Sequence, residues 1–401
     1  MMLGERFQAR VKNELVDETL IHWHGLIPPS AQDGVPMLSQ APLKPGEFFD
    51  YDFENTRSGT HWMHSHLGLQ EQHLLSAPLI VRETAEPLFD EQEHVVMLHD
   101  FSFRDPQEIL ADLKSGGHAG HSMAGMKMAM PGMLNDIVFD AYLANDRTLL
   151  DPEVVRVEKA TQIRLRIINA SAATNMWIDL GALDGELIGV DGNAIYPVKG
   201  SLFPLAMAQR ADVRLKIPEG GGAWPILFRP EGLSARTGIY LATEGAEIAR
   251  LSGEGKMAAE LDLALEMKLR SVALLPPEPV TRTEILNLTG GGADYLWSLN
   301  GKSSMHDTIF TVREGERIEV VMRNETGMAH PMHLHGHYFK VAAINGIAIE
   351  GALRDTVLVP SSTSVTIRFA ADNPGNWAFH CHHLYHMNAG MMGAMRYSGA
   401  A

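Results

Sequence analysis

The chain has 401 residues, of which 45% are hydrophobic, so it is long enough for two or three domains with buried cores. Its formal net charge of −16, from 33 basic and 49 acidic residues, argues against nucleic acid as a partner and mildly favours cationic substrates. Cys381 is the only cysteine, which excludes an internal disulfide, and no apolar run reaches the roughly 18 residues of a membrane-spanning helix.

Residues 1–85 carry two pairs of histidines at one spacing, His22-Trp23-His24 and His64-Ser65-His66. Alternating apolar residues predict a strand over residues 7–11, and residues 77–81 predict another. Because successive side chains of a strand point to opposite faces, both imidazoles of a His-x-His pair share one face of an extended segment. The first six residues lack the basic start and apolar core of a signal peptide.

Residues 86–248 contain no His-x-His pair and no cysteine, and we interpret them as a spacer domain that sets the geometry of its neighbours. Short alternating segments predict strands over residues 95–98, 162–168, 187–190, 211–217 and 238–243. The third of these is followed by a turn, Asp191-Gly192-Asn193. Residues 249–281 include a proline-rich stretch and predict a linker, with a possible short helix near residues 257–265.

A methionine-rich segment occupies residues 118–133 of the middle region. It holds Met123, Met126, Met128, Met130 and Met133. Glycine and proline interrupt any helix there, so the segment is a helix face, a flexible loop or a binding site. Soft thioether ligands prefer Cu(I), and clustered methionines therefore predict a recruitment site for that ion.

The strongest chemical signal lies near the C-terminus, where His380-Cys381-His382 is followed by His386 and Met391. On a strand, Cys381 points away from its two histidine neighbours, so the tripeptide can hold two metal sites back to back. Two imidazoles, one thiolate and a weak axial thioether are the ligands of a blue-copper centre. A covalent connection of this kind suits electron transfer from one metal site to the other.

A further pair, His333-Leu334-His335, brings the His-x-His pairs to four and the imidazoles to eight, enough for a cluster of two or three copper ions. His330 has the opposite strand parity to His333, so it is expected to face Cys381. There it would complete the mononuclear centre with His386 and Met391. Most of the nine other histidines, His383 among them, are expected to be structural or solvent-exposed.

These motifs resemble the copper motifs of the multicopper oxidases, the family of laccases, ascorbate oxidase and bacterial copper-resistance oxidases, over residues 5–397. The resemblance implies an all-β fold of three cupredoxin-like Greek-key β-sandwich or barrel domains, at residues 1–85, 86–248 and 282–401. Many short strands separated by Gly, Pro and Asn turns are typical of such folds. The family's first motif usually follows several strands, whereas here 21 residues precede His22. The first domain is therefore expected to be shortened at its N-terminus.

The resemblance also implies a ligand set for four copper ions. A type-1 copper would be held by His330, Cys381, His386 and Met391. A type-2 copper would be held by His22 and His333. A type-3 pair would be held by His24, His64, His66, His335, His380 and His382. Because the first and third domains each supply two His-x-His pairs, the cluster would lie at their interface.

Reduction of O2 to water consumes protons, so an acid is expected near the cluster. Asp33, in Gln32-Asp33-Gly34, stands where the family has a carboxylate near the type-2 copper, and it could relay protons. The alternative is a simple Asp-Gly turn. Met387 stands where the family often has a second acid, so that relay is lost or replaced. Asp355 is expected either to support a ligand or to pair with an arginine.

Three functions follow from this ligand set. The first is a copper-dependent oxidase that acts on Cu(I), with phenols as side substrates, in copper tolerance, because similar methionine-rich inserts occur in copper-resistance members of the family. The second is a general laccase for phenols and aromatic amines. The third is a copper-storage protein without turnover. O2 is the expected acceptor, a monomer is favoured, and the resemblance implies a periplasmic or secreted protein.

Overall fold

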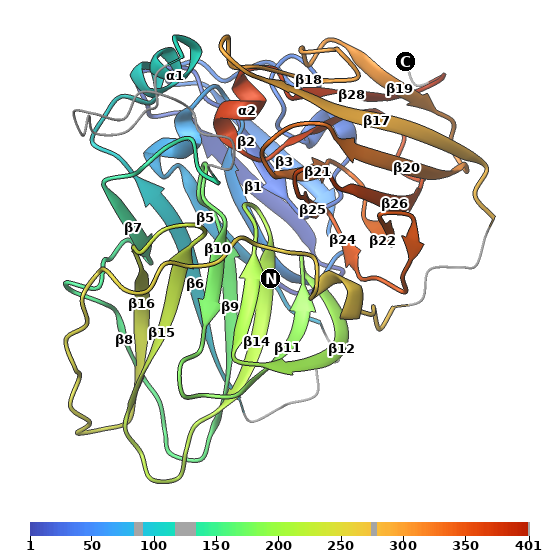
Figure 1. The fold of residues 1–401 in the computed structure, drawn as a ribbon. Helices are drawn as coiled ribbons and strands as arrows, with labels where there is room; N and C mark the ends of the chain where they lie inside the picture. The colour runs from blue at the N-terminus through green and yellow to red at the C-terminus, as the bar shows by residue number, and fades with distance from the viewer. Residues whose placement is uncertain (84–90, 117–133, 274–278, 400–401) are drawn as a thin grey trace.

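The computed structural model describes residues 1–83, 91–116, 134–273 and 279–399 (Figure 1). Within these ranges the chain is built almost entirely from strands, with two α-helices, α1 (Pro106–Lys114) and α2 (Leu384–Asn388). The predicted all-β fold is confirmed. Met123, Met126, Met128, Met130 and Met133 lie outside the described residues, so a Cu(I) site there stays a prediction.

The strands form three blocks of two sheets each. We call them the N-terminal block (β1–β5), the middle block (β6–β16) and the C-terminal block (β17–β28). In Figure 1 the blue strands of the N-terminal block lie between the green middle block and the orange and red C-terminal block.

The N-terminal block pairs β1 (Arg6–Lys12) with β3 (Phe48–Glu54) and joins β2 (Ile21–His24), β4 (Gly59–Ser65) and β5 (Ser76–Val81) in a second sheet. The strands predicted over residues 7–11 and 77–81 are confirmed. Phe7 is buried on β1, where its ring centroid lies 4.6 Å from that of Trp23 and 4.8 Å from that of Phe53. This aromatic packing holds the two sheets together.

The middle block has a six-stranded sheet, in the order β12-β11-β14-β9-β6-β7, and a five-stranded sheet, in the order β13-β10-β15-β16-β8. Its strands are β6 (Glu91–Phe101), β7 (Ala141–Ala144), β8 (Val154–Arg156), β9 (Gln162–Asn169), β10 (Met176–Asp179), β11 (Gly185–Val190), β12 (Asn193–Gly200), β13 (Leu202–Leu205), β14 (Arg210–Lys216), β15 (Ala223–Pro230) and β16 (Thr237–Ala242). All five strands predicted here are present. Asp191 and Gly192 turn the β11–β12 hairpin with φ of 46° and 76°, the backbone that a two-residue hairpin requires.

Helix α1 was not predicted, although its end signals are in the sequence. Asp105 precedes it and accepts a hydrogen bond from the backbone N–H of Gln107 at 2.8 Å, and Pro106 opens its first turn. Ile109 and Leu113, four residues apart, are buried against the middle block.

The prediction of a short helix near residues 257–265 is wrong. The backbone there bridges to the middle block instead, with Ala258 paired to Glu231 and, before it, Glu254 paired to Ala235. These hydrogen bonds satisfy backbone groups that a helix would have satisfied internally. A single 3-10 turn follows at Glu266–Lys268.

The C-terminal block has one sheet in the order β18-β17-β20-β26-β22-β23, with β24 also on β22, and a second in the order β19-β28-β27-β21-β25. Its strands are β17 (Arg282–Gly291), β18 (Leu296–Leu299), β19 (Thr308–Val312), β20 (Arg317–Asn324), β21 (His330–Leu334), β22 (Phe339–Ile344), β23 (Ile347–Ala348), β24 (Leu353–Arg354), β25 (Thr356–Val359), β26 (Ser364–Ala370), β27 (Asn376–Cys381) and β28 (Met392–Tyr397). Strands β21 and β27 are neighbours, and α2 follows β27 directly.

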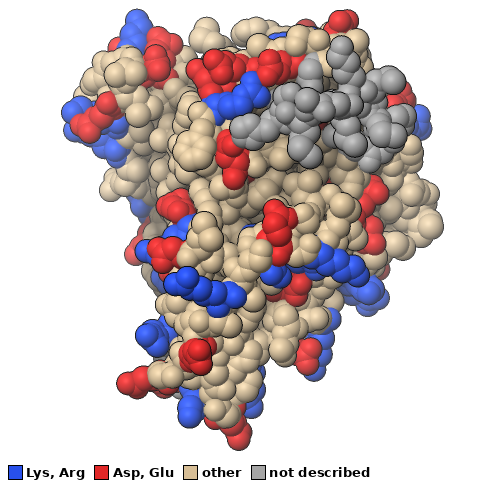
Figure 2. Space-filling view, turned by 60° about the vertical axis from the view of Figure 1, so that its left-hand side comes forward, with Lys and Arg blue, Asp and Glu red and all other residues tan. Residues whose placement is uncertain are grey.

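Among the described residues no helix is long and apolar enough to cross a membrane. On the face drawn in Figure 2, acidic and basic side chains are interspersed, and no continuous basic surface is visible there. That face gives no sign of the basic stripe that nucleic-acid binding requires.

Candidate metal centre

Cross-strand register brings the histidine pairs together within each block. In the N-terminal block, His22 on β2 lies directly opposite His64 on β4. In the C-terminal block, His333 on β21 lies opposite His380 on β27. All eight histidines of the four pairs are buried, so both sheets present imidazoles to an enclosed space.

The two sets of imidazoles meet across the interface between the blocks. The ring centroid of His22 lies 3.9 Å from that of His335, and His24 lies 3.9 Å from His333. The centroids of His66 and His380 are 5.1 Å apart. Residues more than 300 positions apart in the chain therefore share one centre.

Ring nitrogens without partners point into this centre. Five of them are buried and have no hydrogen-bond partner among the described residues: His22 Nε2, His24 Nδ1, His64 Nε2, His333 Nε2 and His382 Nε2. Three more converge, because His380 Nε2 lies 2.9 Å from His335 Nε2 and 3.3 Å from His66 Nε2. Buried polar atoms are rarely left unpaired, so eight converging lone pairs fit bound cations.

Burial also keeps these imidazoles in the form that binds metal. It lowers the pKa of His380 to about 3 and lowers the pKa of five others well below the usual histidine range. Those five are His24, His66, His333, His335 and His382. Neutral imidazole is the ligand form, so protons compete little with a metal here near neutral pH.

Asp33 touches histidines of both blocks. His22 Nδ1 donates to its backbone carbonyl at 2.8 Å, and His335 Nδ1 donates to its Oδ2 at 2.9 Å. Both bonds fix the outer ring nitrogen as the protonated one, which leaves Nε2 free toward the centre. The predicted Asp33 thus lies against the centre, fully buried.

Asp355 repeats this arrangement from the other side. His333 Nδ1 donates to its backbone carbonyl at 2.8 Å, and His24 Nε2 donates to its Oδ1 at 3.1 Å. Its carboxylate also pairs with Arg210, so both roles considered for Asp355 are present.

A third carboxylate, Glu71, was missed by the sequence analysis. It lies in a 3-10 turn, Gln70–His73, and is buried. Its Oε2 is 3.1 Å from His64 Nδ1 and its Oε1 is 3.8 Å from His382 Nδ1. The only sequence signal is an acid five residues after His66, which is too common a spacing to single out.

The mononuclear set converges on the opposite face of β27. His330 Nδ1 and His386 Nδ1 are 3.1 Å apart, and they lie 3.6 Å and 3.9 Å from Cys381 Sγ. His330 Nε2 donates to Thr326 Oγ1 at 2.7 Å, which leaves Nδ1 as the free nitrogen. Burial raises the pKa of the Cys381 thiol, so a metal that binds it must displace a proton.

Met391 is fully buried beside this set. Its backbone N–H donates to His386 O at 2.9 Å, and its carbonyl accepts from Cys381 N at 3.0 Å. The short helix α2 therefore returns Met391 to the strand that carries Cys381.

Asp136 and His383 cover the outer edge of His386 and were not predicted to act here. Asp136 Oδ2 lies 3.4 Å from His386 Nε2, and His383 Nε2 lies 3.2 Å from Asp136 Oδ1. Tyr295 also donates to the Asp136 carboxylate. Asp136 and His383 are 247 positions apart in the chain, and no local motif marks Asp136.

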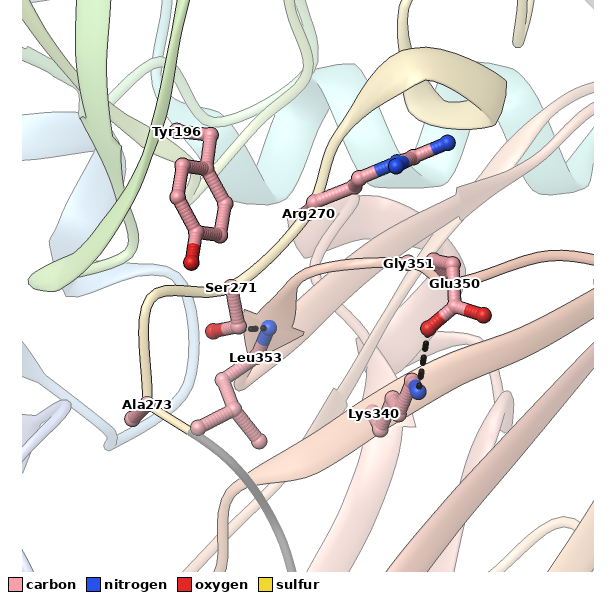
Figure 3. A pocket seen from close by; sticks show the side chains of 8 residues that line it. All are labelled: Tyr196, Arg270, Ser271, Ala273, Lys340, Glu350, Gly351 and Leu353. Carbon is pink, nitrogen blue, oxygen red and sulfur yellow. Dashed lines mark hydrogen bonds and ion pairs between the residues drawn. The ribbon is translucent and has the colours of Figure 1, made fainter.

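A surface pocket of about 320 Å³ lies apart from both sets of ligands. Figure 3 shows its lining: Tyr196, Arg270, Ser271, Ala273, Lys340, Glu350, Gly351 and Leu353. None of the predicted ligands is among these residues, so the pocket is not the metal centre.

Comparison with known proteins agrees with this geometry. Three family models, each described as multicopper oxidase, match residues 1–86, 92–250 and 277–400. The multicopper oxidase MmcO of Mycobacterium tuberculosis is 31% identical over 98% of this chain and 80% of its own length. The chain belongs to the multicopper oxidase family. It is therefore a copper-dependent oxidoreductase that uses O2 as acceptor.

Other relatives agree. Copper resistance protein A of Escherichia coli is 29% identical over 98% of this multicopper oxidase and 86% of its own length. The solved structure of Fet3p, described as a multicopper oxidase that functions in iron import, has a TM-score of 0.83 at 19% identity. That match covers 99% of this chain and 84% of Fet3p, and it supports the cupredoxin-like fold.

Replacing Cys381 tests the mononuclear set. In Cys381→Ser, the intense blue absorption and all oxidase activity should disappear, because no other thiolate exists in the chain. The copper-free protein should still fold, at a cost of about 1–3 kcal/mol in unfolding free energy for the buried hydroxyl. Absorption spectra measure the blue band, O2 uptake measures the oxidase activity, and thermal unfolding measures the stability.

Met391→Leu is the matched control. It removes the weak axial thioether but keeps both imidazoles and the thiolate, so the blue band should persist while the reduction potential shifts. Blue colour retained in Cys381→Ser would contradict the ligand set.

Proposed function

We propose that this protein couples one-electron oxidation of a substrate at a type-1 copper to reduction of O2 to water at a trinuclear copper cluster. We further propose that it is a cuprous oxidase in copper tolerance, periplasmic or secreted, with laccase-like side activity. The observation that carries the proposal is the set of eight buried, converging ring nitrogens directly behind the Cys381 site. A storage protein would not need two sites joined through one tripeptide.

The ligands would be divided among four copper ions. His330, Cys381 and His386, with Met391 as the axial thioether, would hold the type-1 copper. His22 and His333 would hold the type-2 copper. Two triads would hold the type-3 pair: His24, His64 and His382 for one ion, and His66, His335 and His380 for the other. The ligand atoms of the second triad lie within 4.8 Å of one another, so these three residues can share one ion.

When bound, the coppers supply one-electron oxidation at one site and O2 reduction at the other. The chain supplies the connection between them. Cys381 is bonded to His380 and His382, and His380 Nδ1 also donates to the carbonyl of Cys381 at 2.9 Å. The path from the thiolate to the cluster therefore needs no through-space step between separate chain segments.

Asp33 is proposed to hold a proton for the cluster. Its Oδ2 accepts from His335 at 2.9 Å, and its Oδ1 lies 3.3 Å from His22 Nδ1. A buried carboxylate beside the centre can take up a proton and deliver it when O2 is reduced.

The substrate is proposed to bind beside Asp136 and to pass its electron to the type-1 copper through His386. Asp136 places a carboxylate at the outer ring nitrogen of a type-1 ligand, where an electron would enter. A carboxylate there, on a chain with a net charge of −16, favours a cationic donor such as Cu(I). The copper resistance protein A relative supports the same assignment.

Steady-state O2 uptake tests the function. We expect uptake with Cu(I), and weaker uptake with a phenol, only after the protein has been loaded with copper. A higher kcat/KM for the phenol than for Cu(I) would favour a general laccase. No uptake from a fully copper-loaded protein would contradict both enzymes.

Asp33→Ala should slow reoxidation of the reduced enzyme by O2 about 100-fold, because the proton donor is lost. Reduction of the type-1 copper by substrate should stay unchanged, and stopped-flow absorption separates the two steps. Asp33→Asn is the matched control for the bond to His335, since its amide oxygen can still accept that bond but cannot carry a proton. Reoxidation at the wild-type rate in both variants would show that Asp33 only shapes a turn.

Replacing Met123, Met126, Met128, Met130 and Met133 together with Leu should raise the KM for Cu(I) while a bulky phenol is oxidised as before or faster. Leucine keeps the bulk and apolarity of methionine but removes the soft sulfur donor. Initial O2 uptake rates with each substrate measure the effect. An equal loss for both substrates would contradict a role in Cu(I) recruitment, as would no change for either.

A further inference from the structure

We propose that the middle block, which holds none of the ligands predicted for the type-1 copper and the trinuclear cluster, positions histidines of the trinuclear centre through a buried chain of ion pairs. This inference rests on the proposed function. The ion-pair chain consists of five residues: Glu266, Arg354, Asp191, Arg210 and Asp355. It runs from the segment after the middle block to the ligand His24.

Arg210 is the link from the middle block. It stands at the start of β14 with its side chain fully buried. Nη1 donates to Asp355 Oδ1 at 2.7 Å and Nη2 donates to Oδ2, so the contact is bidentate. A bidentate guanidinium fixes both the position and the plane of a carboxylate.

That carboxylate is the one that holds His24. Its Oδ1 accepts from His24 Nε2, and the backbone carbonyl of Asp355 accepts from His333 Nδ1. Outer partners of this kind orient a ligand ring and select its metal-binding nitrogen. Arg210 therefore acts on one histidine from each copper-binding block, although among the described residues it forms no hydrogen bond or ion pair with either.

A second hydrogen bond, from a side-chain amide to a backbone carbonyl, runs beside the ion pair. Gln209 Nε2 donates to the carbonyl of Thr356 at 3.1 Å, and Thr356 pairs with His333 in the β21–β25 register. Two consecutive residues of the middle block thus hold two consecutive residues of the C-terminal block.

The other end of the ion-pair chain is also anchored. Arg354 Nη1 donates to Asp191 Oδ2 at 3.1 Å, and its Nε donates to Glu266 Oε2 at 2.9 Å. Asp191 Oδ1 in turn accepts from the backbone N–H of Arg210 at 2.9 Å. Each charge therefore has an opposite charge beside it, which is the condition under which buried ions are tolerated.

The segment after Glu266 is fastened to both blocks at the pocket of Figure 3. Ser271 N donates to Gly351 O at 3.2 Å, and Leu353 N donates to Ser271 Oγ at 3.3 Å. Tyr196 N, from the middle block, donates to Arg270 O at 3.0 Å. These hydrogen bonds at the pocket hold the segment after Glu266 against the middle and C-terminal blocks, and so they fix the end of the ion-pair chain.

Gly25 shows that the site is shaped around this pair. A Cβ at this position would lie 2.5 Å from His61 Nδ1, 2.6 Å from Arg210 Nη2 and 3.3 Å from Asp355 Oδ2, and the φ of Gly25 is +90°. The glycine that follows His24 is therefore needed both for its backbone and for the room that it leaves to Arg210.

The test compares two buried arginines of the middle block. Arg210→Lys keeps the charge but loses the bidentate contact. Arg166→Lys is the control, because Arg166 is equally buried on β9 but pairs with Asp212 and Glu93, not with the carboxylate that holds His24. For both variants we would measure the thermal unfolding of the copper-free protein, the blue absorption, the type-2 EPR signal and the copper affinity of the cluster.

Both variants should unfold at lower temperature, and both should keep the wild-type blue band. Only Arg210→Lys should change the type-2 hyperfine splitting and weaken copper binding by the cluster, by about 10-fold or more. Wild-type EPR signal and affinity in Arg210→Lys would overturn the proposal and leave the ion-pair chain a stabilising element only.

If Arg210→Lys does not fold, Arg354→Lys carries the test, because it leaves Arg210 and Asp355 in place. A smaller change of the same type-2 signal is then expected, and an unchanged signal would overturn the proposal. A wild-type protein that binds no copper would contradict the proposed function and this inference together. Normal copper signals in both wild type and variant would contradict this inference alone.

Discussion

The centre of this multicopper oxidase is an interface, and that constraint governs the rest of the structure. Four of its eight converging imidazoles come from β2, β4 and the residue after β4, and four come from β21, β27 and the residues that follow them. A shift of either block by an ångström would separate His66 Nε2 from His380 Nε2, which now lie 3.3 Å apart across the interface. Packing between the blocks therefore has to be as precise as packing within them.

Two aspartates meet this demand in a crossed arrangement. Each offers its backbone carbonyl to a histidine of its own block and its carboxylate to a histidine of the other block. The two aspartates differ in the partners of their carboxylate oxygens. Asp355 is clamped by Arg210, whereas the Asp33 carboxylate faces imidazoles, with Oδ1 3.3 Å from His22 Nδ1 and Oδ2 2.9 Å from His335 Nδ1. A clamped carboxylate suits orientation, and an unclamped one suits proton exchange, so the same geometry can serve two purposes.

Sequence reasoning reached the parts of this site that depend on local spacing. The strand period placed both imidazoles of each His-x-His pair on one face of a strand. It placed His330 on the other face of the strand from His333. Turn chemistry found the Asp191–Gly192 hairpin. Reasoning failed where contacts depend on docking: Asp136 meets His383 across 247 residues, and Arg210 meets Asp355 across 145. It also failed near residues 257–265, where pairing with Glu231 and Ala235 took the backbone groups that a helix would have used.

The most direct test of the central claim is a crystal structure of the copper-loaded protein, with anomalous scattering measured at the copper absorption edge. One anomalous peak should lie between Cys381 Sγ and the Nδ1 atoms of His330 and His386. Three more should lie among the eight imidazoles at the interface between the N-terminal and C-terminal blocks. A fully loaded protein without anomalous density at that interface would contradict the account.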